Sequence, residues 1–151
     1  MSILFYLNQQ NNDKSISDFG TFLLEFISQS SKKVVVLCES DFDCSFLKSR
    51  YEKTGKQTII NLYSNKVVES AQKRNVKLEF DHKYLFNIER KRFKNLKSVA
   101  QTASKIEKTL NFIITENDVE SCFFIPIGGI FRSIGMVILQ ELIKHNEMKS
   151  Y

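Results

Sequence analysis

The chain has 151 residues, 42% of them hydrophobic and 26% charged, a composition that excludes an intrinsically disordered protein. This length predicts a single domain over residues 1–151 that needs no disulfide or metal to stabilise its core. The formal charge of +5 weakly favours polyanionic partners such as nucleotides.

The three cysteines, Cys38, Cys44 and Cys122, are odd in number and form no CxxC pair. The chain also has no signal-peptide pattern and no run of 18 apolar residues. These features predict a reducing, cytoplasmic location and no membrane span.

Hydrophobic patterning predicts the first elements. Residues 2–7 form an apolar run typical of a strand, and a polar loop follows them. Apolar residues then recur at helical spacing over 16–27, with Ser15 as the N-cap. The β-branched run at 34–38 predicts a strand buried on both faces, as in a parallel sheet.

The middle of the chain is less regular. Helical spacing resumes over residues 42–51, and residues 57–74 are ambiguous: Ile59–Ile60 fits a short strand, whereas the later residues fit a helix ending near Asn75. The alternation in VKLEF at 76–80 predicts another strand.

The C-terminal part begins with a basic, irregular stretch at 81–97, which we interpret as a solvated face. Apolar residues over 99–113 then give the clearest amphipathic helix in the sequence. Residues 122–127 predict the last strand, Gly128–Gly129 a turn, and residues 132–145 a closing helix.

This alternation predicts an α/β fold, a Rossmann-like three-layer sandwich with a mostly parallel sheet. In such folds ligands bind beyond the carboxyl ends of the strands, where loops and helix N-termini expose N–H groups. Three segments qualify, at 8–12, 39–43 and 128–133.

The first and last of these segments contain groups that can bind a nucleotide. The amides of Asn8, Gln9 and Gln10 can hydrogen-bond a base or ribose, although a solvated turn explains them equally well. In the last segment, glycines let the backbone approach a ligand, Arg132 can bind phosphate and Ser133 can donate a hydroxyl. The alternative there is a tight turn with a surface arginine.

The acidic residues suggest a metal site only weakly. Glu39-Ser-Asp-Phe-Asp43 resembles the E-G-x-x-D motif of TOPRIM nucleases and primases, and Glu116-Asn-Asp118 would be their second acidic motif. However, serine replaces the family glycine, and Glu116-Asn-Asp118 precedes a predicted strand where the family motif follows one. Capping explains acidic residues at a helix start equally well. Glu89-Arg-Lys91 has the E-x-K form of another nuclease class, and two separate histidines do not indicate zinc.

The segment Pro126-Ile-Gly-Gly-Ile-Phe-Arg-Ser-Ile-Gly-Met136 resembles the signature loop of CARF domains, the CRISPR-associated Rossmann-fold sensors. The layout of the N-terminal half is similar as well. This resemblance implies a homodimer in a CRISPR-type antiviral response that binds a cyclic oligoadenylate, with no cofactor, metal or stable DNA partner. The implied ligand-binding residues are Asn8, Gln9, Gln10, Glu39, Ser40, Gly128, Gly129, Ile130, Phe131, Arg132 and Ser133.

The sequence departs from that family in two ways: Ile130 replaces the signature threonine, and the chain stops after the closing helix without a final strand pair or an effector. We therefore expect a nucleotide-binding domain and leave three alternatives open. They are a metal-independent ring nuclease that cleaves the cyclic ligand, a TOPRIM-like enzyme using Glu39 and Asp43, and a protein-interaction module. The sequence identifies no catalytic residue.

Overall fold

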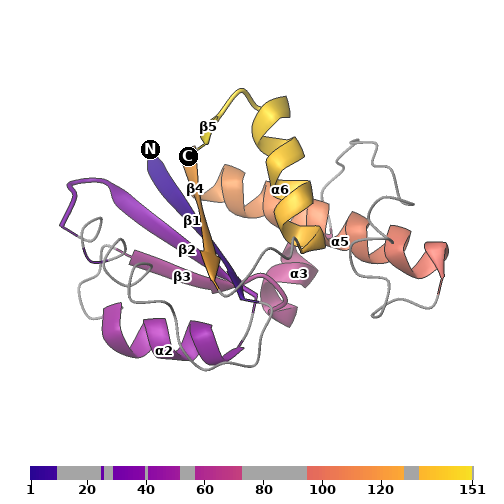
Figure 1. The fold of residues 1–151 in the computed structure, drawn as a ribbon, viewed down its shortest axis with the longest axis horizontal. Coiled ribbons are helices and arrows are strands. Elements are labelled where there is room, and N and C mark those ends of the chain that lie inside the picture. Colours follow the sequence, from indigo (N-terminus) through magenta and orange to yellow (C-terminus); the bar gives the residue numbers. More distant parts are fainter. Residues whose placement is uncertain are drawn as a thin grey trace.

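The computed structural model describes residues 1–9, 25, 29–39, 41–51, 57–72, 95–127 and 133–150. Within these residues, five parallel strands form one sheet in the order β3-β2-β1-β4-β5 (Figure 1). The strands are β1 (Ser2–Gln9), β2 (Lys33–Cys38), β3 (Gln57–Asn61), β4 (Val119–Ile127) and β5 (Lys149–Ser150). The helices are α2 (Asp41–Tyr51), α3 (Asn65–Ala71), α5 (Leu96–Glu116) and α6 (Ile134–His145).

The central strands are continuous apolar runs because both of their faces are covered. In β2, Val35 and Leu37 belong to one hydrophobic cluster, whereas Val34 and Val36 belong to another on the opposite face. Leu4 and Phe5 divide between the same two clusters in β1. Successive side chains of these strands therefore pack into cores on opposite faces of the sheet.

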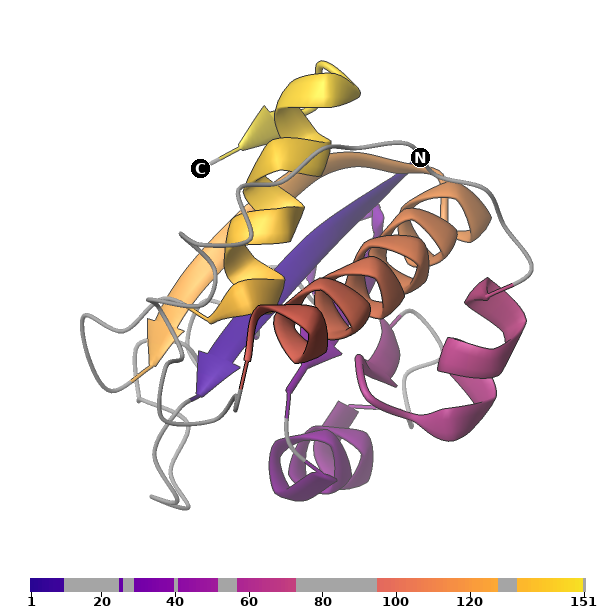
Figure 2. The same ribbon diagram turned by 90° about the vertical axis from the view of Figure 1, so that its right-hand side faces the viewer.

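The helices cover both faces and make the three layers of an α/β sandwich. Helices α5 and α6 cross one face of the sheet side by side (Figure 2), and α3 contacts α5. Helix α2 packs against the opposite face, where Cys44 and Leu47 join the second cluster. This arrangement confirms the Rossmann-like α/β fold expected from the sequence.

The regular spacing of apolar residues in α5 follows from the packing of one face of this helix against the sheet. The five apolar residues that recur every three or four positions are all buried against the sheet: Val99, Ala103, Ile106, Leu110 and Ile113. Asn95 caps the helix, because its side chain accepts a hydrogen bond of 2.9 Å from the backbone N–H of Ser98.

Several expectations are refined. The ambiguous stretch at 57–74 contains both β3 and α3, and α6 begins at Ile134, two residues later than expected. After α6 the chain forms the short β5, which pairs with Ser121 and Cys122 of β4. Nothing in the sequence indicates this strand. The helix expected at 16–27 and the strand expected at 76–80 lie outside the described residues, except for helical Glu25.

The strand order sets the position of a ligand site. From β1, the chain adds β2 and β3 on one side and then β4 and β5 on the other. The order therefore reverses between β1 and β4, and ligands of open α/β sheets bind outside the carboxyl ends of the strands at such a point.

No helix in the described part of the chain has the length and apolar character needed to cross a bilayer.

The three cysteines are buried, and none is in a disulfide. Burial raises the pKa of the Cys122 thiol to about 12.

Candidate ligand site at the carboxyl edge of the sheet

Strands β2, β1 and β4 are neighbours, so the three expected ligand loops leave the sheet from adjacent strands. Leu7 of β1 pairs with Cys38, the last residue of β2. On its other side, Gln9 at the end of β1 pairs with Ile127, the last residue of β4. The segments that follow these three strands therefore begin at the same edge of the sheet.

Three side chains from three different elements meet at this edge. Ser133 Oγ donates a hydrogen bond of 2.7 Å to Glu39 Oε1, and the Tyr6 hydroxyl donates to the same carboxylate oxygen. Tyr6 Oη and Ser133 Oγ are 3.3 Å apart. Tyr6 lies in β1, Glu39 directly follows β2, and Ser133 directly precedes α6. We refer to these residues as the Tyr6–Glu39–Ser133 cluster.

Ser133 also begins α6. Its backbone is extended, and its Oγ accepts a hydrogen bond of 3.1 Å from the N–H of Met136, as expected of an N-cap residue. The hydroxyl therefore accepts from the helix and donates to Glu39 at the same time. Because Ser133 is only 2% exposed, this double role fixes the start of α6 relative to the end of β2.

Tyr6 is fully buried, with its ring on the same face of the sheet as α6. Burial raises the pKa of its hydroxyl well above 10, and the negative charge of Glu39 raises it further. Tyr6 is therefore neutral and acts as a hydrogen-bond donor at physiological pH. Its donation to Glu39 stabilises a carboxylate that lies close to the N-terminus of α6, where the helix dipole also favours negative charge.

Gly135 in the first turn of α6 allows this helix to lie close to Tyr6 and Glu39. A Cβ atom at this position would overlap the Tyr6 hydroxyl and would lie 3.0 Å from Glu39 Oε1 and 3.1 Å from Leu62 Cδ2. Glycine is thus required here by the close contact between α6 and the cluster, although glycine weakens a helix.

Among the ligand residues expected from the sequence, Glu39 and Ser133 come into direct contact. Asn8 and Gln9 end β1 at the same edge. The remaining expected positions lie outside the described residues: Gln10, Ser40, Gly128, Gly129, Ile130, Phe131 and Arg132. Sequence reasoning missed Tyr6, which lies in an apolar run. The available signal is its hydroxyl, since a buried tyrosine usually has a polar partner.

The second acidic motif of the TOPRIM alternative lies at the other end of the sheet from Glu39. Asp118 lies at the opposite, amino edge of the sheet, where its side chain forms an ion pair of 2.8 Å with the amino group of Met1 and its carbonyl accepts from Ser2 N–H. Glu116 ends α5 just before it. The described residues contain no group of three His, Cys, Asp or Glu side chains that could hold a metal ion. Glu89, Lys91 and His82 lie outside the described residues.

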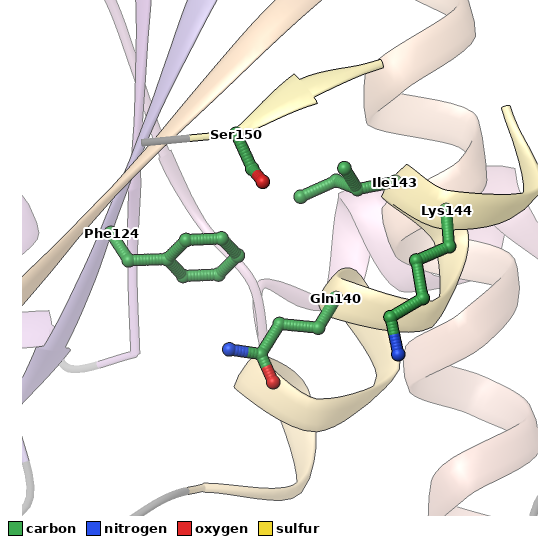
Figure 3. A pocket seen from close by; sticks show the side chains of 5 residues that line it. All are labelled: Phe124, Gln140, Ile143, Lys144 and Ser150. Carbon is green, nitrogen blue, oxygen red and sulfur yellow. The ribbon is translucent and has the colours of Figure 1, made fainter. Parts of the chain in front are cut away.

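A hollow of about 350 Å³ flanks α6 beside β4 and β5 (Figure 3). Phe124, Ile143 and Ser150 point into it from three sides, and Gln140 and Lys144 of α6 line its rim. The Phe124 ring also packs against the Tyr6 ring, with centroids 6.2 Å apart. Gln140 follows Ser133 by seven residues, about 10 Å along the helix, so this part of the hollow lies well away from Ser133.

Comparisons of the chain with protein-family models, with curated proteins and with solved structures find no match.

Proposed function

We propose that this chain is a binding domain for a nucleotide second messenger, a cyclic oligoadenylate, and that the ligand binds at the carboxyl edge of β2, β1 and β4. The proposal depends on the contacts that Glu39 and Ser133 make with each other and with the Tyr6 hydroxyl. This contact joins two of the three segments in which the sequence predicts ligand residues, beside the point where the strand order reverses.

The chemistry at this edge suits a ribonucleotide. Glu39 follows the second strand, and an acidic residue near this place in dinucleotide-binding Rossmann folds accepts hydrogen bonds from ribose hydroxyls. Ser133 caps α6, and the N-terminus of a helix attracts phosphate through its N–H groups and its dipole. Arg132, next to Ser133 in the sequence, supplies a guanidinium that can bind phosphate through two parallel hydrogen bonds.

The direct test is isothermal titration of the chain with cyclic tetra-adenylate and cyclic hexa-adenylate. Binding of either ring supports the proposal, and the absence of heat at high micromolar ligand would refute it. We expect Arg132→Ala to weaken binding by about 1.5–3 kcal/mol, the range for charge-assisted hydrogen bonds. Lys33→Ala is the control, because this exposed residue lies at the amino end of β2 and its substitution should leave the affinity unchanged.

The CARF resemblance adds that the ligand lies across the two-fold axis of a homodimer. Light scattering coupled to gel filtration tests this part of the proposal separately. A dimer that binds one cyclic ligand supports it, and a monomer at micromolar concentration with a 1:1 complex contradicts it.

The contact between the Glu39 carboxylate and the Ser133 hydroxyl favours one second function, cleavage of the bound ring. A carboxylate can act as a general base toward a ribose 2′-hydroxyl. The 2′-oxygen would then attack the adjacent phosphate and form a 2′,3′-cyclic phosphate, while the bond from phosphorus to the 5′-oxygen of the next nucleotide breaks and that oxygen takes up a proton from solvent. Chromatography of the cyclic oligoadenylate after incubation distinguishes cleavage from binding alone. Product formation that persists in EDTA and is lost in Glu39→Gln would establish the ring nuclease. An unchanged ligand leaves binding as the function.

A further inference from the structure

A second hollow lies at the outer side of β3, between α2 and α3. Its volume is about 380 Å³, within the range of small-molecule pockets. Its apolar part comprises Cys44, Ile59, Ile60 and Val67, and its polar part comprises Asp41, Ser45, Lys48, Asn61, Ser64 and Lys66. Both parts come from α2, β3, α3 and the turn between β3 and α3.

This hollow opens at the same edge of the sheet as the Tyr6–Glu39–Ser133 cluster. Asn61 is the last residue of β3 and pairs with Cys38, which directly precedes Glu39. Asp41 begins α2 only two residues after Glu39. Adjacent strands are about 4.8 Å apart, so the hollow lies one strand farther along the edge than Glu39.

Lys48 and Lys66 give the hollow an excess of positive charge. Within the part of the chain that the structure describes, neither lysine forms an ion pair, whereas Lys32 pairs with Glu120 and Lys144 with Glu141. The hydroxyl of Ser64 makes no capping hydrogen bond to α3. These groups are all hydrogen-bond donors, and no described side chain accepts from the two ammonium groups.

Among the described residues of the lining, Asp41 is the one carboxylate. Its Oδ1 accepts a hydrogen bond of 2.6 Å from Asn61 Nδ2, and Asn61 Oδ1 accepts from the N–H of Tyr63 at 2.9 Å. Asn61 therefore holds Asp41 toward the end of β3. The described residues of the lining therefore carry two ammonium groups and one hydrogen-bonded carboxylate, a net charge of +1.

We propose that this hollow binds a phosphate group, with Lys48 and Lys66 as its charged donors. The inference rests on the proposed function in one respect: the phosphate belongs to the same nucleotide ligand that binds at Glu39 and at the N-terminus of α6. A ligand with several phosphates spans from the cluster to the hollow along the carboxyl edge. The site therefore selects an extended oligonucleotide over a mononucleotide.

The test uses the full chain and two probes, inorganic pyrophosphate and cyclic tetra-adenylate, each measured by titration calorimetry at low and moderate salt. Lys48→Gln and Lys66→Gln should each raise the dissociation constant for pyrophosphate about fivefold, which is the upper end of the range for exposed ion pairs. Lys33→Gln removes the same charge at the amino end of β2 and should change it by less than twofold.

The variant Asp41→Asn should change the affinity for pyrophosphate in the opposite direction. The amide oxygen can still accept from Asn61, but the negative charge is gone, so the affinity for pyrophosphate should rise about threefold. A loss of folding cannot produce this increase. A decrease in Asp41→Asn, or equal effects of Lys33→Gln and Lys48→Gln, would overturn the phosphate site.

The two probes separate this inference from the proposed function. Pyrophosphate binding that depends on Lys48 and Lys66, without binding of the cyclic ligand, upholds the phosphate site and refutes cyclic oligoadenylate as the ligand. Binding of the cyclic ligand with equal affinity in the wild type and the Lys48→Gln/Lys66→Gln double variant upholds the proposed function and overturns the phosphate site. Failure of both probes to bind refutes both.

Discussion

Ser133 and Glu39 are 94 positions apart in the sequence, yet Ser133 Oγ donates a hydrogen bond of 2.7 Å to Glu39 Oε1. This contact connects the N-terminus of α6 to the end of β2 across the intervening β1 strand. It also lies where the strand order reverses, so one hydrogen bond serves both the fold and the candidate ligand site.

Replacement of Ser133 by alanine should cost more stability than the loss of an ordinary helix cap. Asn95→Ala, which removes the cap of α5 alone, should destabilise the chain by about 1 kcal/mol. Ser133→Ala removes a cap together with a donor to the carboxylate, and we expect about 2–3 kcal/mol. Urea denaturation of the two variants measures the difference. Equal losses would mean that the bond to Glu39 contributes nothing.

Gly135→Ala should destabilise the chain, although glycine-to-alanine changes normally stabilise helices by about 1 kcal/mol. The added methyl group overlaps the Tyr6 hydroxyl, and overpacking of this kind costs about 1–3 kcal/mol. We expect a lower melting temperature and weaker ligand binding in the same variant. A stabilised Gly135→Ala chain would show that α6 does not approach Tyr6 this closely.

Tyr6 should make the stability fall at high pH. Its pKa in the folded chain is raised well above 10, whereas an unfolded tyrosine has a pKa of about 10. The stabilisation due to neutral Tyr6 is therefore fully present below pH 10. Above that pH it is lost by up to about 1.4 kcal/mol per pH unit as the unfolded chain ionises.

Tyr6→Phe isolates this contribution from those of the other titrating groups. At pH 8 the variant should be less stable than the wild type by about 1–3 kcal/mol, because Glu39 loses a buried donor. Between pH 10 and 11 the difference should narrow. Denaturation at both pH values measures it, and a difference that stays constant would contradict a raised pKa.

Glu147→Gly should stabilise the chain. Glu147 follows α6 with a φ of 53°, a left-handed conformation that costs a non-glycine residue about 1 kcal/mol. The backbone there closes a Schellman motif, because Met148 N–H donates to Ile143 O at 3.0 Å and Glu147 N–H to Lys144 O at 3.3 Å. We expect a gain of about 0.5–1 kcal/mol in thermal unfolding. A loss would indicate that the Glu147 side chain contributes more than its backbone costs.

The sequence predicts the architecture well where hydrophobic patterns are long. The run at 34–38 corresponds to β2 because a strand covered on both faces is apolar throughout. The pattern at 99–113 corresponds to α5 because burial of one helix face imposes a period of three to four residues. Strand β5 cannot be predicted in this way, because a strand of two residues is too short to show a hydrophobic pattern. Its position is set by pairing with Ser121 and Cys122 of β4.

The candidate site is predicted less completely. The rule that ligands bind at the carboxyl ends of parallel strands selects Glu39 and Ser133. The contact between them depends on tertiary packing, which local patterns do not encode. Tyr6 resembles any other apolar strand residue in the sequence, and only the sheet order brings its hydroxyl to Glu39.

Titration of the ¹⁵N-labelled chain with cyclic tetra-adenylate shows whether the ligand binds at the Tyr6–Glu39–Ser133 cluster. We expect the amide shift changes to concentrate at Glu39, Ser133 and Gly135, while the amides of Asp118 and Glu147 near the opposite edge stay unchanged. Shift changes centred on Asp118 and Glu147, or no changes at saturating ligand, would contradict it.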